Sequence, residues 1–370
     1  MSNAAYVALA LVPGVGRVRL EILMQTFGSA DAVLAATFRQ LNSVVRISRA
    51  AATAIHKTTP AAGTEIIDKV AGQGGVVLTP ADAAFPGELR QIPDAPTLLF
   101  AKGRLDLLQG PCVALVGSRD HSRYGADVAS ELSAGIAAAG ITVVSGMARG
   151  LDAVAHQAAL DAGGRGGGGD GGGTVGVLGN GLGVIYPAAN RVLYERVIAA
   201  GCLLTEFPPG ERPNAGSFPR RNRLISGLAR ATVVLEARDG SGALITADCA
   251  LSQGREVMAV PGPITSPLSR GTNRLIQMGA KPVLELRDVL EEYGISEVPE
   301  VSLPADLSDA ERRALEALGD GAELVDDVTA RLACAPAESL AVLTSLEIRG
   351  LVAQGPGKVF RATKPFGGRT

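Results

Sequence analysis

The sequence contains no tryptophan, only 4% aromatic residues, four cysteines and three histidines among 370 residues. So few rings argue against the single-strand binders that stack bases on rows of aromatic side chains. The cysteines form no CxxC pair and the histidines lie far apart, so no metal site is expected. Scattered thiols fit a reducing compartment. No apolar run approaches the roughly 20 residues of a transmembrane helix. We therefore expect a cytoplasmic protein with no membrane partner.

The net charge of −2 argues at first against a nucleic-acid-binding protein. The charge is unevenly distributed, however. Residues 1–284 carry 26 basic and 21 acidic residues, residues 285–327 carry 3 and 14, and residues 328–370 carry 6 and 2. The acidic residues 285–327 thus offset the net positive charge of residues 1–284 in the total. Arginine outnumbers lysine 29 to 6. This bias suits contacts to phosphates and bases, although GC-rich coding would also produce it.

Six short apolar runs alternate with helix-like segments in the middle of the chain. Continuous apolar strands separated by helices are typical of a parallel sheet covered on both faces. We therefore predict an α/β fold, a doubly wound Rossmann-like parallel sheet within residues 76–294, with ligands at the carboxyl ends of its strands. The predicted strands are residues 112–117, 141–146, 174–179, 202–207, 231–237 and 256–262.

Two smaller domains are predicted at the ends of the chain. Residues 1–75 are alanine-rich and predict a helical domain of the helix-hairpin-helix or SAM-like type. Its segment 11–23 carries a Pro-Gly-x-Gly turn, whereas segment 41–55 lacks the second glycine signature. Two interpretations of this domain are therefore open: a module that binds DNA, and a module that only stabilises the fold. Residues 309–370 predict three helices and a β-hairpin, the outline of a winged-helix domain.

Two connecting segments have distinct compositions. Residues 295–308 combine prolines and acidic residues, which predicts a linker. Residues 163–173 include nine glycines and predict a flexible surface insertion between a helix and a strand.

Glycines follow three of the predicted strands, next to hydroxyl or arginine side chains. The N-terminus of a helix presents N–H groups and partial positive charge to anions, and glycine lets the backbone approach them. Three such turns at one sheet edge would form a row of phosphate sites, to which arginines add bidentate contacts. Alternatively, the glycines only permit tight connections. The residues predicted to bind phosphates are Gly117, Ser118, Arg119, Gly146, Arg149, Ser241 and Gly242.

The most basic segment, residues 211–230, carries five arginines and one glutamate. Apolar Leu224, Ile225 and Leu228 place its arginine run at the start of a helix, where positive charge opposes the helix dipole. An anionic ligand would compensate for this, and the neighbouring phenyl ring would stack on a base. The alternative is a solvated helix start with one buried ring. The residues predicted to bind DNA here are Phe218, Arg220, Arg221, Asn222 and Arg223.

No set of residues for catalysis stands out. The sequence lacks a Walker loop and an assignable Ser/His/Asp or Cys/His set. LGNGLG (178–183) resembles a dinucleotide fingerprint, but no acidic residue stands at the spacing needed for the ribose. We therefore assign no catalytic residues and expect no cofactor. His156 is expected to be a packed residue or to lie at the edge of a phosphate site.

Together these motifs resemble one bacterial family, that of DNA processing protein A (DprA, also called Smf). They follow the family's order over about residues 112–285, although the glycine insertion and Thr205, often serine in the family, depart from its pattern. The motifs are VGSRDHSRYG (116–125), SGMARGLDAVAH (145–156), VLGNGLGVIYPAANRVL (177–193), TEFPPG (205–210), FPRRNRLISGL (218–228), VVLEARDGSGALITA (233–247), GREVMAVPG (254–262) and GTNRLIQMGA (271–280).

The resemblance implies a protein that binds and protects incoming single-stranded DNA during natural transformation, without catalysis. It also implies that RecA recombinase is loaded onto this strand while single-strand-binding protein is displaced. The family's DNA pocket corresponds here to Arg119, Gly146, Arg149 and the FPRRNR run. Family members act as homodimers through the Rossmann-like core. The dimer edge is expected at the GTNRLIQMGA helix, with Leu275 and Ile276 as candidates.

Two other classes of function are open. Nucleotide-binding phosphoribohydrolases have a similar Rossmann fold, but their PGGxGTxxE motif is replaced here by DGSGALITAD, without the Gly-Gly pair or the catalytic glutamate. A structural protein that docks partners through its winged helix alone would leave the FPRRNR segment without a role.

Overall fold

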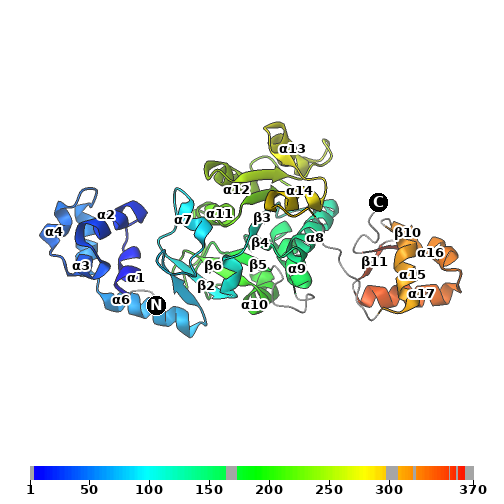
Figure 1. Ribbon diagram of the computed structural model, residues 1–370, viewed down its shortest axis with the longest axis horizontal. Helices are drawn as coiled ribbons and strands as arrows, with labels where there is room; N and C mark the ends of the chain where they lie inside the picture. The colour runs from blue at the N-terminus through cyan, green and yellow to red at the C-terminus, as the bar shows by residue number, and fades with distance from the viewer. Residues whose placement is uncertain are drawn as a thin grey trace. The chain divides into compact units, whose positions relative to one another are not determined.

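In the computed structural model, all six predicted apolar runs are strands of one nine-stranded sheet, β1-β2-β6-β5-β4-β3-β7-β8-β9, among the residues described (Figure 1). Strands β6 to β9 in this order are parallel. Strand β2, which the sequence did not predict, pairs antiparallel with β6 and with β1. The prediction of a parallel sheet is therefore corrected at this edge, where β2 runs antiparallel to β6, and β1 pairs antiparallel with β2 across a connection that contains α7 (Gly87–Gln91). The strands are β1 Val76–Leu78, β2 Leu99–Gly103, β3 Cys112–Val116, β4 Thr142–Ser145, β5 Thr174–Val177, β6 Cys202–Thr205, β7 Ala231–Val234, β8 Glu256–Ala259 and β9 Lys281–Pro282.

The structure describes residues 4–163, 173–296, 307–319, 322–349, 351–355 and 357–362. These residues belong to two units that divide between residues 299 and 300. The predicted glycine insertion (163–173) and linker (295–308) lie almost wholly outside the described residues. The helices of the first unit are α1 Ala4–Ala10, α2 Arg17–Phe27, α3 Ala30–Ala35, α4 Phe38–Ser43, α5 Arg49–Lys57, α6 Pro60–Gly72, α7 Gly87–Gln91, α8 Arg123–Ala138, α9 Leu151–Gly163, α10 Arg191–Ala200, α11 Ser217–Leu228, α12 Gly242–Ser252, α13 Arg270–Gln277 and α14 Leu286–Leu290.

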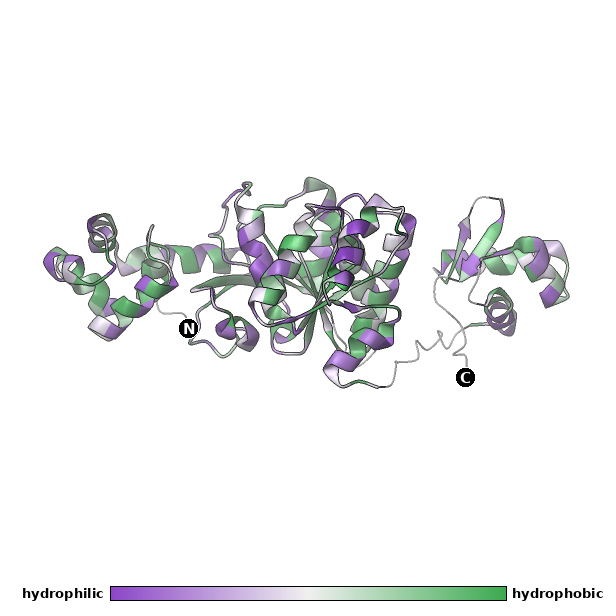
Figure 2. Cartoon of the chain, turned by 90° about the horizontal axis from the view of Figure 1, so that it is seen from above, coloured by the Kyte–Doolittle hydropathy of each residue, from purple (hydrophilic) through white to green (hydrophobic). Residues whose placement is uncertain are grey.

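Alternation along the central strands divides the core into two layers. Val113 and Leu115 of β3 pack with apolar residues of α8, α9 and α14. Ala114 and Val116 of the same strand pack on the opposite side with residues of α11, α12 and α13. Figure 2 shows the apolar strands lying between the helices. Because both faces are covered, the residues of β3 are buried without alternation, which explains the continuous apolar run in the sequence.

The N-terminal helices contain two similar turns. The first turn precedes α2 and has Gly14 at φ +82°, and the second precedes α5 and has Arg46 at φ +66°. The same backbone hydrogen bond closes each of them, from Val15 to Val12 and from Ile47 to Val44. The second turn therefore keeps the left-handed conformation without its glycine, at a cost of about 1 kcal/mol.

The second unit is a winged helix with its own apolar core. The predicted three helices and β-hairpin are confirmed, and a short strand, β10, was not predicted. Strand β12 pairs antiparallel with both β10 and β11. The elements are α15 Asp309–Leu318, β10 Ala322–Leu324, α16 Val325–Leu332, α17 Pro336–Ile348, β11 Val352–Gly355 and β12 Val359–Ala362.

Candidate functional site

A cavity of about 280 Å³ lies at the carboxyl ends of β3, β4 and β5, against the first turn of α11. Its wall combines backbone after these strands with side chains that the sequence places far apart. We call it the arginine–aromatic cavity, lined by Arg119, Arg149, Tyr186, Phe218, Arg221 and the backbone around Gly146 and Gly179. Of the predicted site residues, the structure thus brings together Arg119, Gly146, Arg149, Phe218 and Arg221. A position at the carboxyl ends of parallel strands is where doubly wound folds bind ligands.

Two aromatic rings and an arginine stack within this cavity. The ring centres of Tyr186 and Phe218 lie 5.5 Å apart at an interplanar angle of 35°. The guanidinium carbon of Arg119 lies 5.8 Å from the ring centre of Phe218. Tyr186 is 45% exposed, and Arg119 and Arg149 are exposed as well. The exposed Tyr186 ring, the half-buried Phe218 ring and the guanidinium groups provide both a flat apolar surface and positive charge.

Arg221 lies in the same cavity but is almost completely buried. Its guanidinium donates hydrogen bonds to the carbonyl oxygens of Gly146 and Val177. Burial lowers the pKa of Arg221, while the carboxylate of Asp152 acts in the opposite direction. An arginine remains charged in proteins, so Arg221 is a fixed cation beneath the cavity. Its contacts join the turn after β4 to the end of β5.

The turn after β4 is fixed from within the protein. The carboxylate of Asp152 accepts hydrogen bonds from the N–H groups of Gly146 (3.1 Å) and Ala148 (3.3 Å). Met147 between them adopts φ +55°, a left-handed conformation that non-glycine residues rarely take. Burial raises the pKa of Asp152, and Arg221 and the two N–H groups oppose this. Since Gly146 and Ala148 donate inward, the expectation that this turn offers their N–H groups to phosphate does not hold.

His156 holds the same turn from below. Its Nε2 accepts a hydrogen bond from the Met147 N–H (3.3 Å), and its Nδ1 lies 2.6 Å from the hydroxyl oxygen of Thr174. That hydroxyl donates to the carbonyl oxygen of Val143 (2.7 Å), so it accepts from Nδ1–H. The imidazole is therefore neutral, with its proton on Nδ1. Burial and the charge of Arg221 lower the pKa of His156 to about 3. The imidazole is fully buried and both of its nitrogens have partners within the protein, as expected of a packed residue.

Glycines of the first two turns serve close packing. Gly150 has φ +79°, and a Cβ there would lie 2.4 Å from the carbonyl oxygen of Ser118. The N–H of Leu151 donates to this same oxygen (3.1 Å), and the Leu151 side chain occupies the space beside Gly117. Gly117 and Ser118 therefore hold the turns after β3 and β4 together behind the cavity wall. At Gly117 and Ser118 the geometry therefore agrees with the alternative interpretation, in which these residues permit a tight connection between strand and helix.

The other arginines of α11 contact a glutamate of the protein itself. Arg220 Nε lies 2.7 Å from Glu206 Oε1, and the guanidinium of Arg223 contacts the other oxygen of Glu206. The Glu206 side chain is only 4% exposed. We expected an anionic ligand to compensate for these arginines at the helix start. The structure corrects this for Arg220 and Arg223, because Glu206 supplies the negative charge.

Asn222, Ser241 and Gly242 form a structural connection outside the cavity wall. The Asn222 side-chain amide donates to the carbonyl oxygen of Gly242 (3.3 Å). The Ser241 hydroxyl caps α12 by accepting from the N–H of Ala243 (3.3 Å). These contacts fix the start of α12 relative to α11.

Two residues of α13 were expected at a dimer edge, Leu275 and Ile276. Leu275 is 8% exposed and belongs to the core layer formed with α11 and α12, and Ile276 packs against this layer. The exposed apolar side chain at the end of this helix is Met278 (70% exposed).

The sequence did not identify Tyr186, Asn180 and Glu206 as site residues. Asn180 Nδ2 donates to the carbonyl oxygens of Gly181 (3.1 Å) and Val184 (2.8 Å), which shapes the loop that carries Tyr186. One signal was present: a glycine-rich loop directly after a predicted strand, ending in an aromatic residue, within LGNGLGVIYP. No group of His, Cys, Asp and Glu that could hold a metal ion occurs among the described residues. Within the same residues, no helix is long and apolar enough to cross a bilayer.

Comparison with known families gives two matches along the chain. The family model described as DNA recombination-mediator protein A matches residues 76–294. The model of the DprA winged helix domain matches residues 298–358.

Curated relatives and solved structures agree with these matches. DNA processing protein DprA of Streptococcus pneumoniae is 45% identical over 212 residues, covering 57% of this chain and 72% of that protein. Protein Smf of Escherichia coli is 39% identical over 295 residues, 77% of each chain. The X-ray structure of DprA from S. pneumoniae has a TM-score of 0.68 at 35% identity and covers 79% of this chain and 98% of its own. A structure of DNA processing protein A from Helicobacter pylori, described for its single-stranded DNA binding mode, has a TM-score of 0.53 at 26% identity and covers 59% of this chain and 95% of its own.

Proposed function

This chain belongs to the DNA recombination-mediator protein A family, and from this premise we propose that it binds single-stranded DNA in the arginine–aromatic cavity. The observation that carries the proposal is the stack of Arg119, Phe218 and Tyr186 beside exposed Arg149. Binding of single strands without sequence preference requires cations along the phosphates and a few rings on which bases stack. The cavity provides both within about 280 Å³. The relative from H. pylori, whose structure is described for binding single-stranded DNA, supports this assignment.

The residues of the cavity divide into two roles. Arg119 and Arg149 contact phosphates, and Phe218 and Tyr186 stack on bases. Arg221, Asp152 and His156 position the turn after β4, because their polar groups are engaged within the protein. Phosphate recognition at this turn therefore falls to arginine side chains rather than to the N–H groups of Gly146 and Ala148.

We further infer that the bound strand is protected and passed to RecA recombinase, with displacement of single-strand-binding protein, during natural transformation and recombination. The family description, a recombination mediator, supports this role. It requires no covalent bond to be made or broken, so it needs no catalytic group. A homodimer through the edge that includes α13 belongs to the same proposal, with Met278 as its exposed apolar residue.

The experiment compares a fluorescent single strand with the duplex of the same sequence in anisotropy titrations of the full chain. We expect the single strand to bind more tightly at every salt concentration, because a duplex does not expose its base faces to the two rings. In parallel, ATP hydrolysis by RecA is measured on DNA coated with single-strand-binding protein. An earlier onset of ATP hydrolysis when this protein is present supports the loading of RecA. Equal affinity for duplex and single strand contradicts the binding proposal, and unchanged onset contradicts RecA loading alone.

A further inference from the structure

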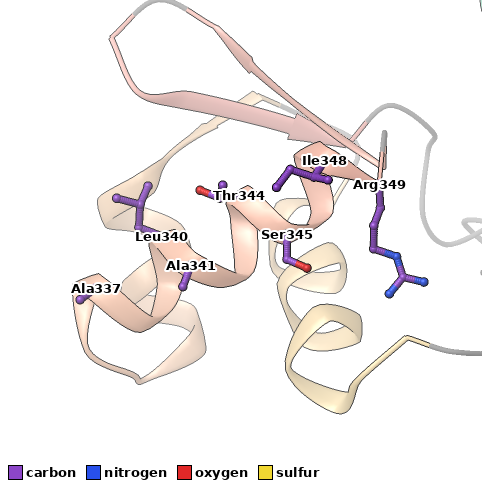
Figure 3. A pocket seen from close by; sticks show the side chains of 7 residues that line it. All are labelled: Ala337, Leu340, Ala341, Thr344, Ser345, Ile348 and Arg349. Atoms are coloured by element: carbon purple, nitrogen blue, oxygen red, sulfur yellow. The ribbon is translucent and has the colours of Figure 1, made fainter.

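The third helix of the winged helix, α17, has an apolar stripe on its outer face. Its inner face is buried through Leu343 and Leu346. The outer stripe follows spacings of three and four residues, which places its members on one side of a helix. Figure 3 shows these side chains along α17. The stripe consists of Ala337, Leu340, Ala341, Thr344 and Ile348, and we call it the α17 stripe.

The α17 stripe is exposed in the second unit. Ile348 is 83% and Leu340 39% exposed. A shallow depression of about 610 Å³ runs along this face. Isolated apolar residues are common on surfaces, whereas mainly apolar side chains on one side of a helix over about three turns form a contiguous surface that a partner can cover. Ser345 and Arg349 line the same depression. The length of the α17 stripe, 11 residue-to-residue steps from Ala337 to Ile348 at about 1.5 Å each, is roughly 16 Å.

The charges of this helix argue against DNA as the occupant. Proteins of the helix-turn-helix type place this helix in the major groove and neutralise phosphates with lysine and arginine. Residues 336–348 contain no lysine or arginine, and they contain Glu338 and Glu347. Arg349, which follows, lies 3.3 Å from Glu311 and pairs with it.

Other arginines of this unit are also engaged internally. Arg312 and Arg313 donate to the carbonyl oxygens of Leu307 and Leu332. Arg331 pairs with Glu323 at 3.1 Å. Residues 307–362 as a whole carry six basic and nine acidic residues, so a polyanion would meet net negative charge.

We propose that the α17 stripe binds an amphipathic helix of a partner protein, whose apolar stripe is flanked by lysines or arginines. A straight apolar helix face accepts another helix by packing ridges into grooves. On a helix with 100° per residue, Glu338 and Glu347 lie on opposite borders of the stripe, so basic residues on both flanks of the partner complement them. A second copy of this chain would present the same two glutamates, and the arginine next to its stripe pairs with Glu311. This site belongs to the unit that does not contain the arginine–aromatic cavity, so it adds a protein partner to the proposed DNA binding.

The test uses the full chain and two labelled synthetic helical peptides with the same leucine stripe. One peptide has lysines on both flanks of the stripe and the other has glutamates. We expect only the lysine peptide to bind in anisotropy titrations. Ile348→Ser weakens this binding about tenfold or more, because the side chain lies within the contact. Val45→Ser, at an apolar position 76% exposed in the first unit, is the matched control and leaves it unchanged.

Charge reversal provides a second arm that does not depend on apolar contacts. Glu338→Lys combined with Glu347→Lys should weaken binding of the lysine peptide and allow the glutamate peptide to bind. These positions are exposed, so unchanged thermal unfolding verifies the fold. Absent binding of the lysine peptide, or equal binding of both peptides, overturns the proposal. A shift in the sedimentation coefficient of Ile348→Ser would assign the α17 stripe to contact with a second copy of the chain. Loss of duplex DNA binding in this variant would assign the stripe to DNA. Either result also overturns the proposal.

Discussion

The guanidinium of Arg221 donates a hydrogen bond to the carbonyl oxygen of Gly146, and a Cβ at Gly146 would lie 2.7 Å from this same guanidinium. The N–H of Gly146 at the same time donates to Asp152. Both polar groups of this glycine are thus used within the protein. The most basic motif of the sequence therefore contains one arginine that builds the cavity, while its neighbours on α11 contact Glu206.

Replacement of Arg221 should reduce stability more than replacement of Arg220. Arg221→Met leaves the buried carboxylate of Asp152 and two carbonyl oxygens without their cation, which costs about 3–5 kcal/mol of unfolding free energy. Arg220→Ala removes a largely exposed side chain, with an expected cost of at most about 1 kcal/mol. Urea unfolding of the full chain measures both. Similar losses in the two variants would contradict a structural role specific to Arg221.

The neutral imidazole of His156 should make stability depend on pH. The folded pKa of about 3 lies below the ordinary value of 6.5, so the unfolded chain binds the extra proton between these values. The stabilisation is therefore complete above pH 6.5 and is lost towards pH 3, by up to about 1.4 kcal/mol for each pH unit.

The His156→Gln variant isolates this contribution. Asp152, whose pKa burial raises, contributes a slope of opposite sign, but it is present in both proteins and cancels in their difference. We expect a flatter decline of stability below pH 6.5 in His156→Gln than in the unaltered chain. His121→Gln, at an exposed position, is the matched control. Parallel curves for His156→Gln and the unaltered chain would show that this imidazole is not held neutral.

The two rings of the cavity should contribute affinity that salt does not remove. Phe218→Leu and Tyr186→Leu each lose about 1–3 kcal/mol of binding to a single strand, because stacking on a base is lost while the charge is unchanged. Tyr186→Phe keeps the ring and serves as control. Anisotropy titrations at low and high salt should show the same loss. Unaltered affinity in both leucine variants would exclude stacking in this cavity.

The first unit should bind single-stranded DNA without the winged helix. A chain that ends at residue 294 retains all fully buried residues of both core layers, the last of which is Leu290, and loses only the partly buried Ile295. We expect its affinity for a single strand to match that of the full chain within about threefold. Circular dichroism verifies its fold. A folded fragment that has lost binding would move the DNA site to the winged helix and contradict the cavity assignment.

Strands and helices could be predicted from the sequence where one physical cause dominates. Residues of β3 to β8 are buried on both faces, so their runs are mainly apolar, and their alternation with helices predicts a parallel sheet. Strand β2 was missed because only its first three residues, Leu99–Ala101, are apolar, and because prolines precede it. Its antiparallel pairing depends on β6, more than 90 residues away, which local pattern does not show.

The sequence predicted a site at the carboxyl ends of the strands and several of its residues, but not the contacts that these residues make. Arg220 and Arg221 are adjacent in sequence, yet consecutive helix positions differ by about 100° in direction. One side chain is therefore 59% exposed, whereas the other residue is 5% exposed. Glu206 could not be recognised as their partner because it comes from a separate strand end. Tyr186 was missed since its proximity to Phe218 arises only from the fold.

The salt dependence of single-strand binding in Arg119→Ala combined with Arg149→Ala tests the central claim most directly. Each phosphate contact of a single strand contributes about 0.7 to the slope of log affinity against log salt. We predict that the double variant binds at least about tenfold more weakly at low salt and that its slope is smaller by about 1.4, while Arg287→Ala, an exposed arginine on α14, leaves both unchanged. An unchanged slope and affinity in the double variant would contradict DNA binding in the arginine–aromatic cavity.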